Sequence, residues 1–564
     1  MLGKDLSRRI AEALFKACRN YFQKNLPDKD FPEETDVALQ LTRDIKHGDL
    51  TSNVAMRLAS RAGMNPAQLG KGIIGEFEQQ SRKDGISEFI GEVALAGGFI
   101  NLRFSEDYFH KLLVNIEQQR EDFGRSDEGH GQHVNLEFVS ANPTGPLTIA
   151  HGRQAAIGDA LSRILRFMGY QVTNEYYLND YGRQIRLLGE SVKVRYRNLC
   201  GRQEDMPEDG YMGDYIIDIA REIKEQKGEA MLGDDRQTDR FFQDHAVKYM
   251  MGLIEKDLED FGVSFDTWTS QAGIEERKEV EQALSLLEEK GYIYDSEGAR
   301  WFASSRLGDD KDRVVVKSDG SYTYLAPDIA YHMDKYSRGY TKLIDLLGPD
   351  HHGYIKRMKA AVQALGHDRS SLDILIVQLV TLLRGGEAVS MSTRKGEFIS
   401  LREILQEIGK DVTRFFFLSR RLDSHLDFDI ELAKKESADN PVFYMQYAHA
   451  RICSIKKHRE EKLPELSFES TQLELLKEKQ ERALMRKLGE FPFAVKASCE
   501  ALEPNRLIVY LNELARSFHS FYTECRVVSD DEELSKARLI LVECVQIVLA
   551  NGLGLLDIAL PEKM

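Results

Sequence analysis

The sequence predicts a multidomain α/β protein, in which a Rossmann-like domain with a parallel sheet lies between an N-terminal α+β module and a C-terminal α-helical bundle. The 564 residues are too many for one hydrophobic core and imply roughly three or four domains. From residue 134, short apolar segments alternate with longer helical stretches, which is typical of βαβ units. Beyond about residue 400, long amphipathic helical patterns predict the bundle.

The elements follow in order along the chain. The first module has helical periodicity at 6–22 and 55–62 and a strand-like end at 98–103. A polar stretch with several glycines at 124–131 indicates a linker, and no strand is expected after residue 400. The predicted domains are 1–112 (N-terminal module), 113–131 (linker), 132–400 (sheet domain) and 401–564 (helical domain), with strands expected at 134–138, 171–177, 343–347 and 374–382.

Two segments inside the sheet domain differ from their surroundings. Residues 197–248 are rich in glycine, aspartate and glutamate, which indicates an insertion. Within 314–324, the pair Asp319-Gly320 supplies the positive φ that a tight hairpin turn requires. We therefore expect an inserted module and a hairpin in this domain.

Charge and hydropathy exclude several classes of protein. The net charge of −16 argues against a DNA-binding protein or one that coats nucleic acid non-specifically, because such affinity comes from neutralising phosphates. Basic stripes at 456–459 and 482–487 leave a specific RNA partner open. The apolar segment 541–560 carries Glu543 and Asp557 and predicts a packed helix, not a membrane span.

The N-terminus and the cysteines predict a cytoplasmic protein. Residues 1–18 form an amphipathic pattern with Asp5 and Glu12 and lack the apolar stretch of a secretory signal. The six cysteines are scattered, without a C-x-x-C pair or a histidine at metal-ligand spacing. We expect reduced thiols, no metal site of the protein's own, and a monomer.

The most informative segment, residues 137–152, is an apolar strand that breaks into a turn and then opens a helix. Pro143, Gly145 and Pro146 let the backbone approach a ligand closely. The helix that begins near His151 offers unpaired N–H donors and about half a positive charge, and His151 can add a proton donor. The pattern indicates a phosphate site, although a capped strand-to-helix corner also explains this segment taken alone.

A second segment favours the phosphate interpretation. The apolar run 374–383 leads into a glycine-flanked loop that carries the cations Arg394 and Lys395. A strand followed by a mobile basic loop suits a clamp for a triphosphate. The alternative is an ordinary solvated basic turn.

These two segments resemble the HIGH signature and the KMSKS loop of class I aminoacyl-tRNA synthetases. The blocks at 177–184, 318–331, 348–358 and 440–451 also resemble those of the arginyl-tRNA synthetase family, in that family's order and over essentially the whole chain. The resemblance implies a catalytic domain of the class I type, with a KMSKS-like loop at 390–396. It also implies a bacterial-type enzyme that uses ATP, Mg²⁺, L-arginine and tRNA(Arg), generally with tRNA present during arginine activation.

The resemblance assigns roles to residues of both signature segments. It implies that a catalytic group of five lies against the triphosphate and closes on the pyrophosphate. These are Thr148, His151, Ser392, Arg394 and Lys395. It also implies an ATP-binding set, partly at the end of the strand at 343–347, where open α/β sheets bind ligands. This set is Gly145, Pro146, Ala150, His151, Gly152, Gly348, Asp350, His351, His352 and Met391.

The chain departs from the family pattern at four positions. Thr148 stands in place of the first histidine of HIGH and Ala150 in place of its glycine, while Ser390 and Thr393 stand where KMSKS has lysines. Thr148 keeps a hydroxyl donor for a phosphate, without the charge of a cationic one. These departures motivate an alternative, a catalytically weakened tRNA-binding or scaffold paralogue. A third hypothesis, adenylation for an acceptor other than tRNA, is disfavoured by the C-terminal blocks.

Arginine as substrate demands acidic partners, because a guanidinium has five donors and no acceptor. The resemblance places Glu137 and Asp328 at the guanidinium, Tyr324 beside it and Asn142 near the α-amino group. Three residues that follow another strand end are further candidates for arginine or ribose contacts, namely Asp180, Tyr181 and Gln184. Taken alone, Glu137 would more simply be an exposed residue of an edge strand.

Two further predictions concern metal and RNA. The sequence 350–352 is Asp-His-His, but adjacent histidines on one turn point apart and no third ligand has suitable spacing, so Mg²⁺ is expected only as the companion of ATP. In the helical domain, stacking planes and charge alternate as anticodon recognition requires, although a half-buried aromatic helix is an alternative. The predicted tRNA contacts are Tyr444, Tyr447, His449 and Arg451, with the first module touching the tRNA elbow.

Overall fold

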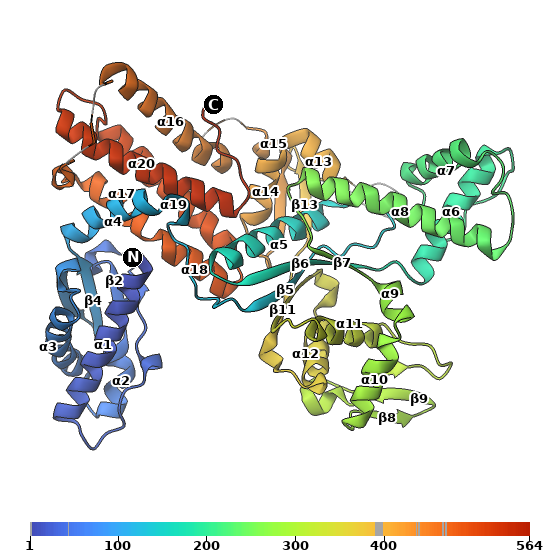
Figure 1. The fold of residues 1–564 in the computed structure, drawn as a ribbon, viewed down its shortest axis with the longest axis horizontal. Helices are drawn as coiled ribbons and strands as arrows, with labels where there is room; N and C mark the ends of the chain where they lie inside the picture. Colours follow the sequence, from blue (N-terminus) through green and yellow to red (C-terminus); the bar gives the residue numbers. More distant parts are fainter. Residues whose placement is uncertain are drawn as a thin grey trace.

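The computed structural model describes residues 3–42, 44–389, 399–435, 437, 440–464, 467–468 and 471–564. Figure 1 shows a central parallel sheet from which a helical module projects to one side. The N-terminal module lies beneath the C-terminal helices, on the other side of the sheet. The predicted order of an α+β module, a parallel-sheet domain and a helical domain is therefore confirmed.

The N-terminal module packs helices on one face of an antiparallel sheet with strand order β1-β2-β4-β3. The predicted helices and strand are all present: 6–22 lies in α1, 55–62 in α2 and 98–103 largely in β4. Helix α4 follows β4 and packs against α17 and α20 of the C-terminal helices. The elements are α1 (Gly3–Asn25), β1 (Gln40–Leu41), β2 (Leu50–Ser52), α2 (Val54–Ala62), α3 (Pro66–Lys83), β3 (Ile90–Ala96), β4 (Phe99–Phe104) and α4 (Glu106–Gln119).

The central sheet has five parallel strands in the order β12-β11-β5-β6-β7. Helix α5 (Ile149–Phe167) makes the crossover from β5 to β6 and is buried on most of its surface. Because the strands are parallel, their carboxyl ends meet at one edge, where such sheets bind ligands. The strands are β5 (His133–Glu137), β6 (Gln171–Leu178), β7 (Thr267–Ser270), β11 (Lys342–Leu347) and β12 (Leu372–Ile376).

The single strand predicted at 374–382 is wrong, because two strands of different sheets share this apolar run. Strand β12 ends at Ile376, and β13 (Val380–Arg384) belongs to a separate sheet with β14 (Glu387–Ala388) and β15 (Leu426–Asp429). The prediction of no strand after residue 400 also fails, since β15 pairs in parallel with β13. Hydropathy cannot mark where a buried chain leaves one sheet for another.

Two smaller units extend the sheet domain. Helices α6 (Arg183–Leu199), α7 (Asp214–Lys227) and α8 (Arg236–Asp260) surround an apolar core of their own and form the projecting module. Gly320, at φ +81°, lies in the turn that returns the chain from β10 toward Tyr322, as the hairpin prediction required. The second unit comprises α9 (Gln271–Glu276), α10 (Glu279–Glu289), β8 (Ile293–Ser296), β9 (Ala299–Phe302), β10 (Arg313–Val316), α11 (Leu325–Ser337) and α12 (Tyr354–Leu365).

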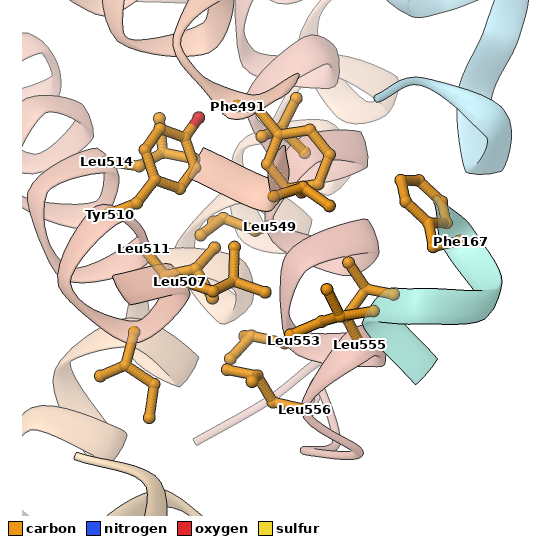
Figure 2. Packing of buried hydrophobic residues seen from close by; sticks show 14 of the residues in the cluster. Phe167, Phe491, Leu507, Tyr510, Leu511, Leu514, Leu549, Leu553, Leu555 and Leu556 are labelled. Atoms are coloured by element: carbon orange, nitrogen blue, oxygen red, sulfur yellow. The ribbon is translucent and has the colours of Figure 1, made fainter. Parts of the chain in front are cut away.

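The C-terminal helices pack against the end of α5. Figure 2 shows Phe167, in the last turn of α5, beside Leu553 and Leu555 of α20. Helix α20 is long and apolar enough to cross a membrane, but 72% of its most apolar window is buried in the protein. The helices are α13 (Leu401–Ile408), α14 (Lys410–Leu418), α15 (Ile430–Ala433), α16 (Pro441–Lys462), α17 (Lys479–Gly489), α18 (Phe491–Ala501), α19 (Asn505–Glu524) and α20 (Glu532–Leu555).

A glycine in α5 permits the close approach of this helix to the chain that follows β5. A β-carbon added at Gly158 would lie 2.2 Å from the Phe138 ring, whereas one at Gly252 in α8 would meet nothing within 4 Å. We expect Gly158→Ala to lower the free energy of unfolding of the sheet domain by about 2 kcal/mol through overpacking. The control Gly252→Ala should be neutral or slightly stabilising. Urea denaturation followed by tryptophan fluorescence measures both, and equal stability of the two variants would contradict the packing.

Candidate active site

The first signature segment contacts the part of the chain that follows the second one. The backbone of Thr148 forms an antiparallel bridge with Ser400, and the Leu401 N–H donates to the Leu147 carbonyl at 2.7 Å. Ser400 lies four residues after the predicted loop at 390–396 and caps helix α13. The chain that follows the loop is therefore attached beside the start of α5. The predicted residues Met391, Ser392, Arg394 and Lys395 lie outside the described residues.

The first turn of α5 holds a neutral histidine. Thr148 is the N-cap, and the Nδ1 atom of His151 accepts from the Thr148 backbone N–H at 3.2 Å. Burial lowers the pKa of His151 to about 4. An uncharged imidazole whose Nδ1 is an acceptor carries its proton on Nε2. His151 can thus donate a hydrogen bond to a phosphate without being a cation, and the helix terminus supplies the positive potential.

The turn before α5 is shaped by its neighbours. Tyr215 of α7 donates to the Thr144 carbonyl at 2.8 Å, and Gly145, Pro146 and Ala150 are half-buried. Gly152 is different, because a β-carbon there would lie 2.7 Å from Leu401 and 3.0 Å from Phe417. This glycine is required for the packing of α5 against the helices that follow the basic loop, a reason that its sequence context did not indicate.

The remaining predicted ATP residues follow β11 at the carboxyl edge of the sheet. Gly348 leads into the short turn that holds Asp350 and His351, and all side chains at 350–352 are exposed. The Nε2 atom of His352 lies 3.5 Å from Nε2 of Gln378, which precedes β13. Strand β11 neighbours β5, so these residues and the start of α5 lie along the same sheet edge.

The predicted arginine residues fall into two groups. Asn142 and Gln184, from the segments after β5 and β6, are joined by an amide hydrogen bond of 2.7 Å. By contrast, Asp180 accepts from Ser270 Oγ at 2.6 Å and from the Ala272 N–H at 2.9 Å and so fixes the start of α9. The structure leaves two aromatic candidates in solvent, with exposed fractions of 55% for Tyr181 and 86% for Tyr324.

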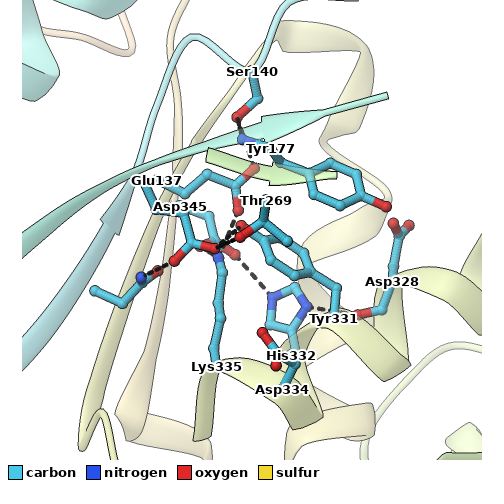
Figure 3. A network of polar contacts seen from close by, with 12 residues as sticks. Glu137, Ser140, Tyr177, Thr269, Asp328, Tyr331, His332, Asp334, Lys335 and Asp345 are labelled. Carbon is cyan, nitrogen blue, oxygen red and sulfur yellow. Dashed lines mark hydrogen bonds and ion pairs between the residues drawn. The ribbon is translucent and has the colours of Figure 1, made fainter. Parts of the chain in front are cut away.

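Asp328 and Tyr177 place their polar ends close together and define the candidate arginine pocket. Burial raises the pKa of Asp328 to about 6, against the hydroxyl of Tyr354, which donates to this carboxylate. The Tyr177 hydroxyl is buried and has no hydrogen-bond partner among the described residues. Figure 3 shows the Tyr177 hydroxyl and the Asp328 carboxylate pointing into the same space. A carboxylate beside an unpaired hydroxyl suits a planar cation with several donors.

A row of three buried carboxylates crosses the sheet beneath this pocket. Asp345 of β11, Glu137 of β5 and Glu175 of β6 are register partners on adjacent strands. The fully buried Lys335 places its Nζ 2.6 Å from Glu137 and 2.8 Å from Asp345, and Arg338 binds Glu175 at 2.8 Å. Lys335 lies in the last turn of α11, and Arg338 is the residue that caps this helix (Figure 3 shows Lys335). This network lies below the pocket as a paired acidic layer.

The network decides which acid remains available to a ligand. Burial raises the pKa of Glu137 although Lys335 opposes it, whereas at Asp345 burial is outweighed by Lys335 and His332, and the pKa falls well below its usual range. The second oxygen of Glu137 accepts from Ser140 at 3.0 Å. A guanidinium contact with Glu137 must therefore compete with the ammonium of Lys335, whereas the Asp328 carboxylate is bound by the neutral hydroxyl of Tyr354.

Sequence reasoning missed Tyr177 and most of the network. The pattern that could have found them is an acidic residue in the middle of an apolar strand, as at Glu175 and Asp345. Lys335 and Arg338, three residues apart at the end of α11, are the matching cations. A charged residue in a buried strand requires a partner, so such acids predict internal cations.

The predicted tRNA residues on α16 are only partly brought together. The guanidinium of Arg451 lies between two rings, 4.6 Å from the Tyr447 centroid and 4.5 Å from that of Tyr522. Tyr444 is half-buried against His519. His449 is buried, with Nδ1 3.0 Å from the Pro561 carbonyl and Nε2 3.0 Å from Gln546, so the structure does not present it with the others.

Comparison with known families matches each part of this architecture. Family models match in chain order: the arginyl tRNA synthetase N terminal domain at residues 4–104, the catalytic domain of class I tRNA synthetases (R) at 112–417 and the DALR anticodon binding domain at 445–564. The chain belongs to the arginyl-tRNA synthetase family. The predicted family and class I fold are thereby confirmed.

Relatives of the arginyl-tRNA synthetase family cover the full chain. The arginine–tRNA ligase of Desulforamulus reducens is 43% identical over 100% of both chains, and that of Desulfosudis oleivorans is 46% identical over 94% of this chain and 95% of its own. The structure of the Thermus thermophilus arginyl-tRNA synthetase superposes with a TM-score of 0.76 over 100% of both chains at 21% identity, which shows a shared fold.

The raised pKa of Asp328 gives arginine binding a pH dependence with a definite sign. Above about pH 6 the carboxyl is ionised and attracts the guanidinium, and below it the carboxyl is neutral. The dissociation constant for arginine should therefore fall as the pH rises from about 5 to about 7. Asp328→Asn should weaken binding by about a hundredfold and remove this dependence. Calorimetry measures both, and a pH-independent affinity of the unmodified chain would contradict the assignment.

Removing the internal cation should destabilise the sheet. Lys335→Met leaves Glu137 and Asp345 buried without their shared partner, which we expect to cost about 3–5 kcal/mol. The matched control is Lys342→Met on β11, where a partly exposed pair with Asp373 is lost at about 1 kcal/mol or less. Thermal unfolding at about pH 8 and pH 5 measures the effect, which should be smaller at the lower pH because protonation can neutralise the two acids. Equal losses in both variants would disprove the role of the network.

Proposed function

We propose that this chain is an arginine–tRNA ligase, which activates L-arginine with ATP and transfers it to the 3′ end of tRNA(Arg). The observation that carries the proposal is the attachment of Leu401 to Leu147, which joins the chain after the basic loop to the start of α5, at the carboxyl edge of the sheet. Full-length relatives with this activity support it. The predictions of a cytoplasmic enzyme and of a monomer accompany the proposal, and the buried position of α20 supports action away from a membrane.

The reaction has two steps, and the chain contributes mainly position and charge to both. An oxygen of the arginine carboxylate attacks the α-phosphorus of ATP, and pyrophosphate leaves. A ribose hydroxyl of the tRNA then attacks the activated carbonyl carbon, and AMP leaves. Since negative charge gathers on the phosphates in the first step, the N-terminus of α5 and the Nε2–H of His151 are suited to hold it.

The nucleotide is proposed to lie along the carboxyl edge of the sheet. Gly145, Pro146 and Ala150 flank the start of α5, and the segment 348–352 follows the adjacent strand. Magnesium would arrive with the ATP phosphates, since Mg²⁺ usually takes few protein ligands.

Arginine is proposed to extend from the nucleotide toward Asp328. The Tyr177 hydroxyl can accept a donor of the guanidinium, and the Asn142–Gln184 amide pair can orient the α-amino group. The glutamate row below adds negative potential but is already paired. The pocket therefore offers one carboxylate with free capacity for one cationic side chain.

The helical domain is proposed to read the anticodon. Tyr447, Arg451 and Tyr522 form a stack whose outer faces can accept bases, since base stacking on aromatic and guanidinium planes contributes about 1–3 kcal/mol per base. The N-terminal module is proposed to contact the tRNA elbow. The match of residues 445–564 to the DALR anticodon binding domain supports the first of these proposals.

The decisive experiment is arginine-dependent exchange of radioactive pyrophosphate into ATP by the purified chain. We expect exchange with arginine and tRNA(Arg) present, and little without the tRNA. His151→Ala should slow exchange by about tenfold or more, because one donor to the developing charge is removed. Tight tRNA binding without exchange would favour the scaffold hypothesis. Exchange that is indifferent to tRNA would favour adenylation for another acceptor.

A further inference from the structure

Arg153 and Arg414 are the largest fully buried side chains among the described residues, and none of the roles above uses Arg153. It lies on α5, two residues after His151 of the proposed phosphate site. Arginine is among the residues least often buried completely. An arginine in this position therefore requires an explanation.

The guanidinium of Arg153 binds main-chain carbonyls. Its Nη1 donates to the carbonyls of Gln378 and Ser424, each at 2.9 Å, and its Nη2 donates to that of Arg421 at 2.9 Å. The planar fork thus joins two chain segments that are more than forty residues apart in sequence. A lysine carries its donors on a single nitrogen and cannot reproduce this geometry.

The charge of Arg153 has no ion-pair partner within the described residues. Burial lowers its pKa to about 10, with only Asp423 acting in the opposite direction, so the side chain stays charged at neutral pH. Placing a cation among carbonyls is costly compared with an apolar side chain of similar volume. Stability alone would favour the apolar side chain. The arginine therefore indicates that the two segments it binds must be held in a fixed position.

The carbonyls that Arg153 holds belong to the entrances of two paired strands. Gln378 lies two residues before β13, and Ser424 lies two residues before β15. These strands run in parallel, with Val380 opposite Leu426. Strand β13 leads through β14 to the predicted basic loop at 390–396. Arg153 therefore fixes the strand pair from which this loop departs.

The far side of the loop is attached to the same helix start. The Leu401 N–H binds the Leu147 carbonyl, six residues before Arg153. The side chain of Gln378 also reaches His352, so the segment held by Arg153 adjoins the predicted ATP residues after β11. The chain before the basic loop is thus bound to α5 through Arg153. The chain after the loop is bound to Leu147, just before α5 begins.

We propose that Arg153 is a positioning residue for arginine activation, which sets the β13–β15 pair against α5 and against the proposed ATP residues after β11. It contacts no substrate. This inference rests on the proposed ligase function. It adds Arg153 to the residues that the two signature segments assign to the reaction. A displacement of the strand pair by about 1 Å would be enough to slow the chemical step severely.

The test compares Arg153→Met with Arg166→Met in the full-length chain. Arg166 lies on the same helix and also donates to a main-chain carbonyl, that of Val172 at 2.8 Å, but away from the loop. For Arg153→Met we expect the kcat of tRNA-dependent pyrophosphate exchange to fall by roughly tenfold to a hundredfold. The KM for arginine and the Kd for tRNA should change by less than about twofold, because their contacts are elsewhere. Arg166→Met should keep the exchange rate.

Amide hydrogen exchange supplies a second readout that does not depend on activity. In Arg153→Met, the amides of β13 and β15 should exchange faster, while those of β3 and β4 in the N-terminal module stay unchanged. A folded variant with the exchange kcat and the amide protection of the unmodified chain would overturn the proposal. So would a loss of kcat matched by equal losses of arginine and tRNA affinity, which would indicate general unfolding.

Two outcomes are separated by design. If the unmodified chain shows no pyrophosphate exchange, the ligase function fails, and the protection of β13 and β15 still decides whether Arg153 positions them. If Arg153→Met does not fold, Arg153→Lys replaces it, since lysine keeps the charge and part of the bonding. Arg153→Lys should show reduced kcat with arginine KM retained, and full activity of that variant would overturn the proposal.

Discussion

Helix α5 is buried along most of its length, and its successive turns meet different parts of the molecule. The first turn holds Thr148 and His151 at the proposed phosphate site. Arg153 follows, bound to the entrances of β13 and β15, and Asp159 forms an ion pair with the buried Arg414 of α14. The last turn places Phe167 in the core of the C-terminal helices. Packed cores deform little, so a shift of this helix would move all of these regions together.

The approach of α5 to its neighbours depends on two glycines. Gly152 makes room for Leu401 and Phe417, and Gly158 makes room for Phe138. A β-carbon at either position would push the helix away from the elements that carry the site. The same helix that ends in the C-terminal domain thus reaches the catalytic edge of the sheet. A tRNA bound to that domain and a nucleotide at that edge would rest on one rigid element.

The electrostatics of the pocket depend on what is already paired. Lys335 and Arg338 neutralise most of the carboxylate row on β11, β5 and β6, so this row sets the shape and potential of the pocket floor. Asp328 lies above this row, and burial raises its pKa to about 6, so that its carboxyl is ionised at neutral pH. In the proposed site, selectivity for a guanidinium would depend on the positions of the internal cations as well as on the number of acids. A second free carboxylate would hold water or metal ions in competition with the substrate.

Much of the fold could be predicted from the sequence, because each part depends on local patterns. The alternation of apolar strands and helices from residue 134 gave the parallel sheet, and the turn at Pro143–Pro146 marked the start of α5. The break at residues 377–379 could not be predicted, since hydropathy is equally high on both sides of a change of sheet. The strand β15 is four residues long and gains its pairing only from β13. Its sequence alone carries too little pattern to be recognised.

The candidate site divides in the same way. Residue types and order determined by themselves the family of the chain, and they predicted two phosphate-directed corners, acidic partners for arginine and a tRNA-binding tail, because these rest on turn chemistry, charge and family motifs. Only the tertiary structure decided that Glu137 is held by Lys335, that His449 faces inward to Pro561, and that Arg153 joins two strands. Such contacts link residues more than a hundred positions apart, and the partner of a buried charge is chosen by packing, which no local pattern records.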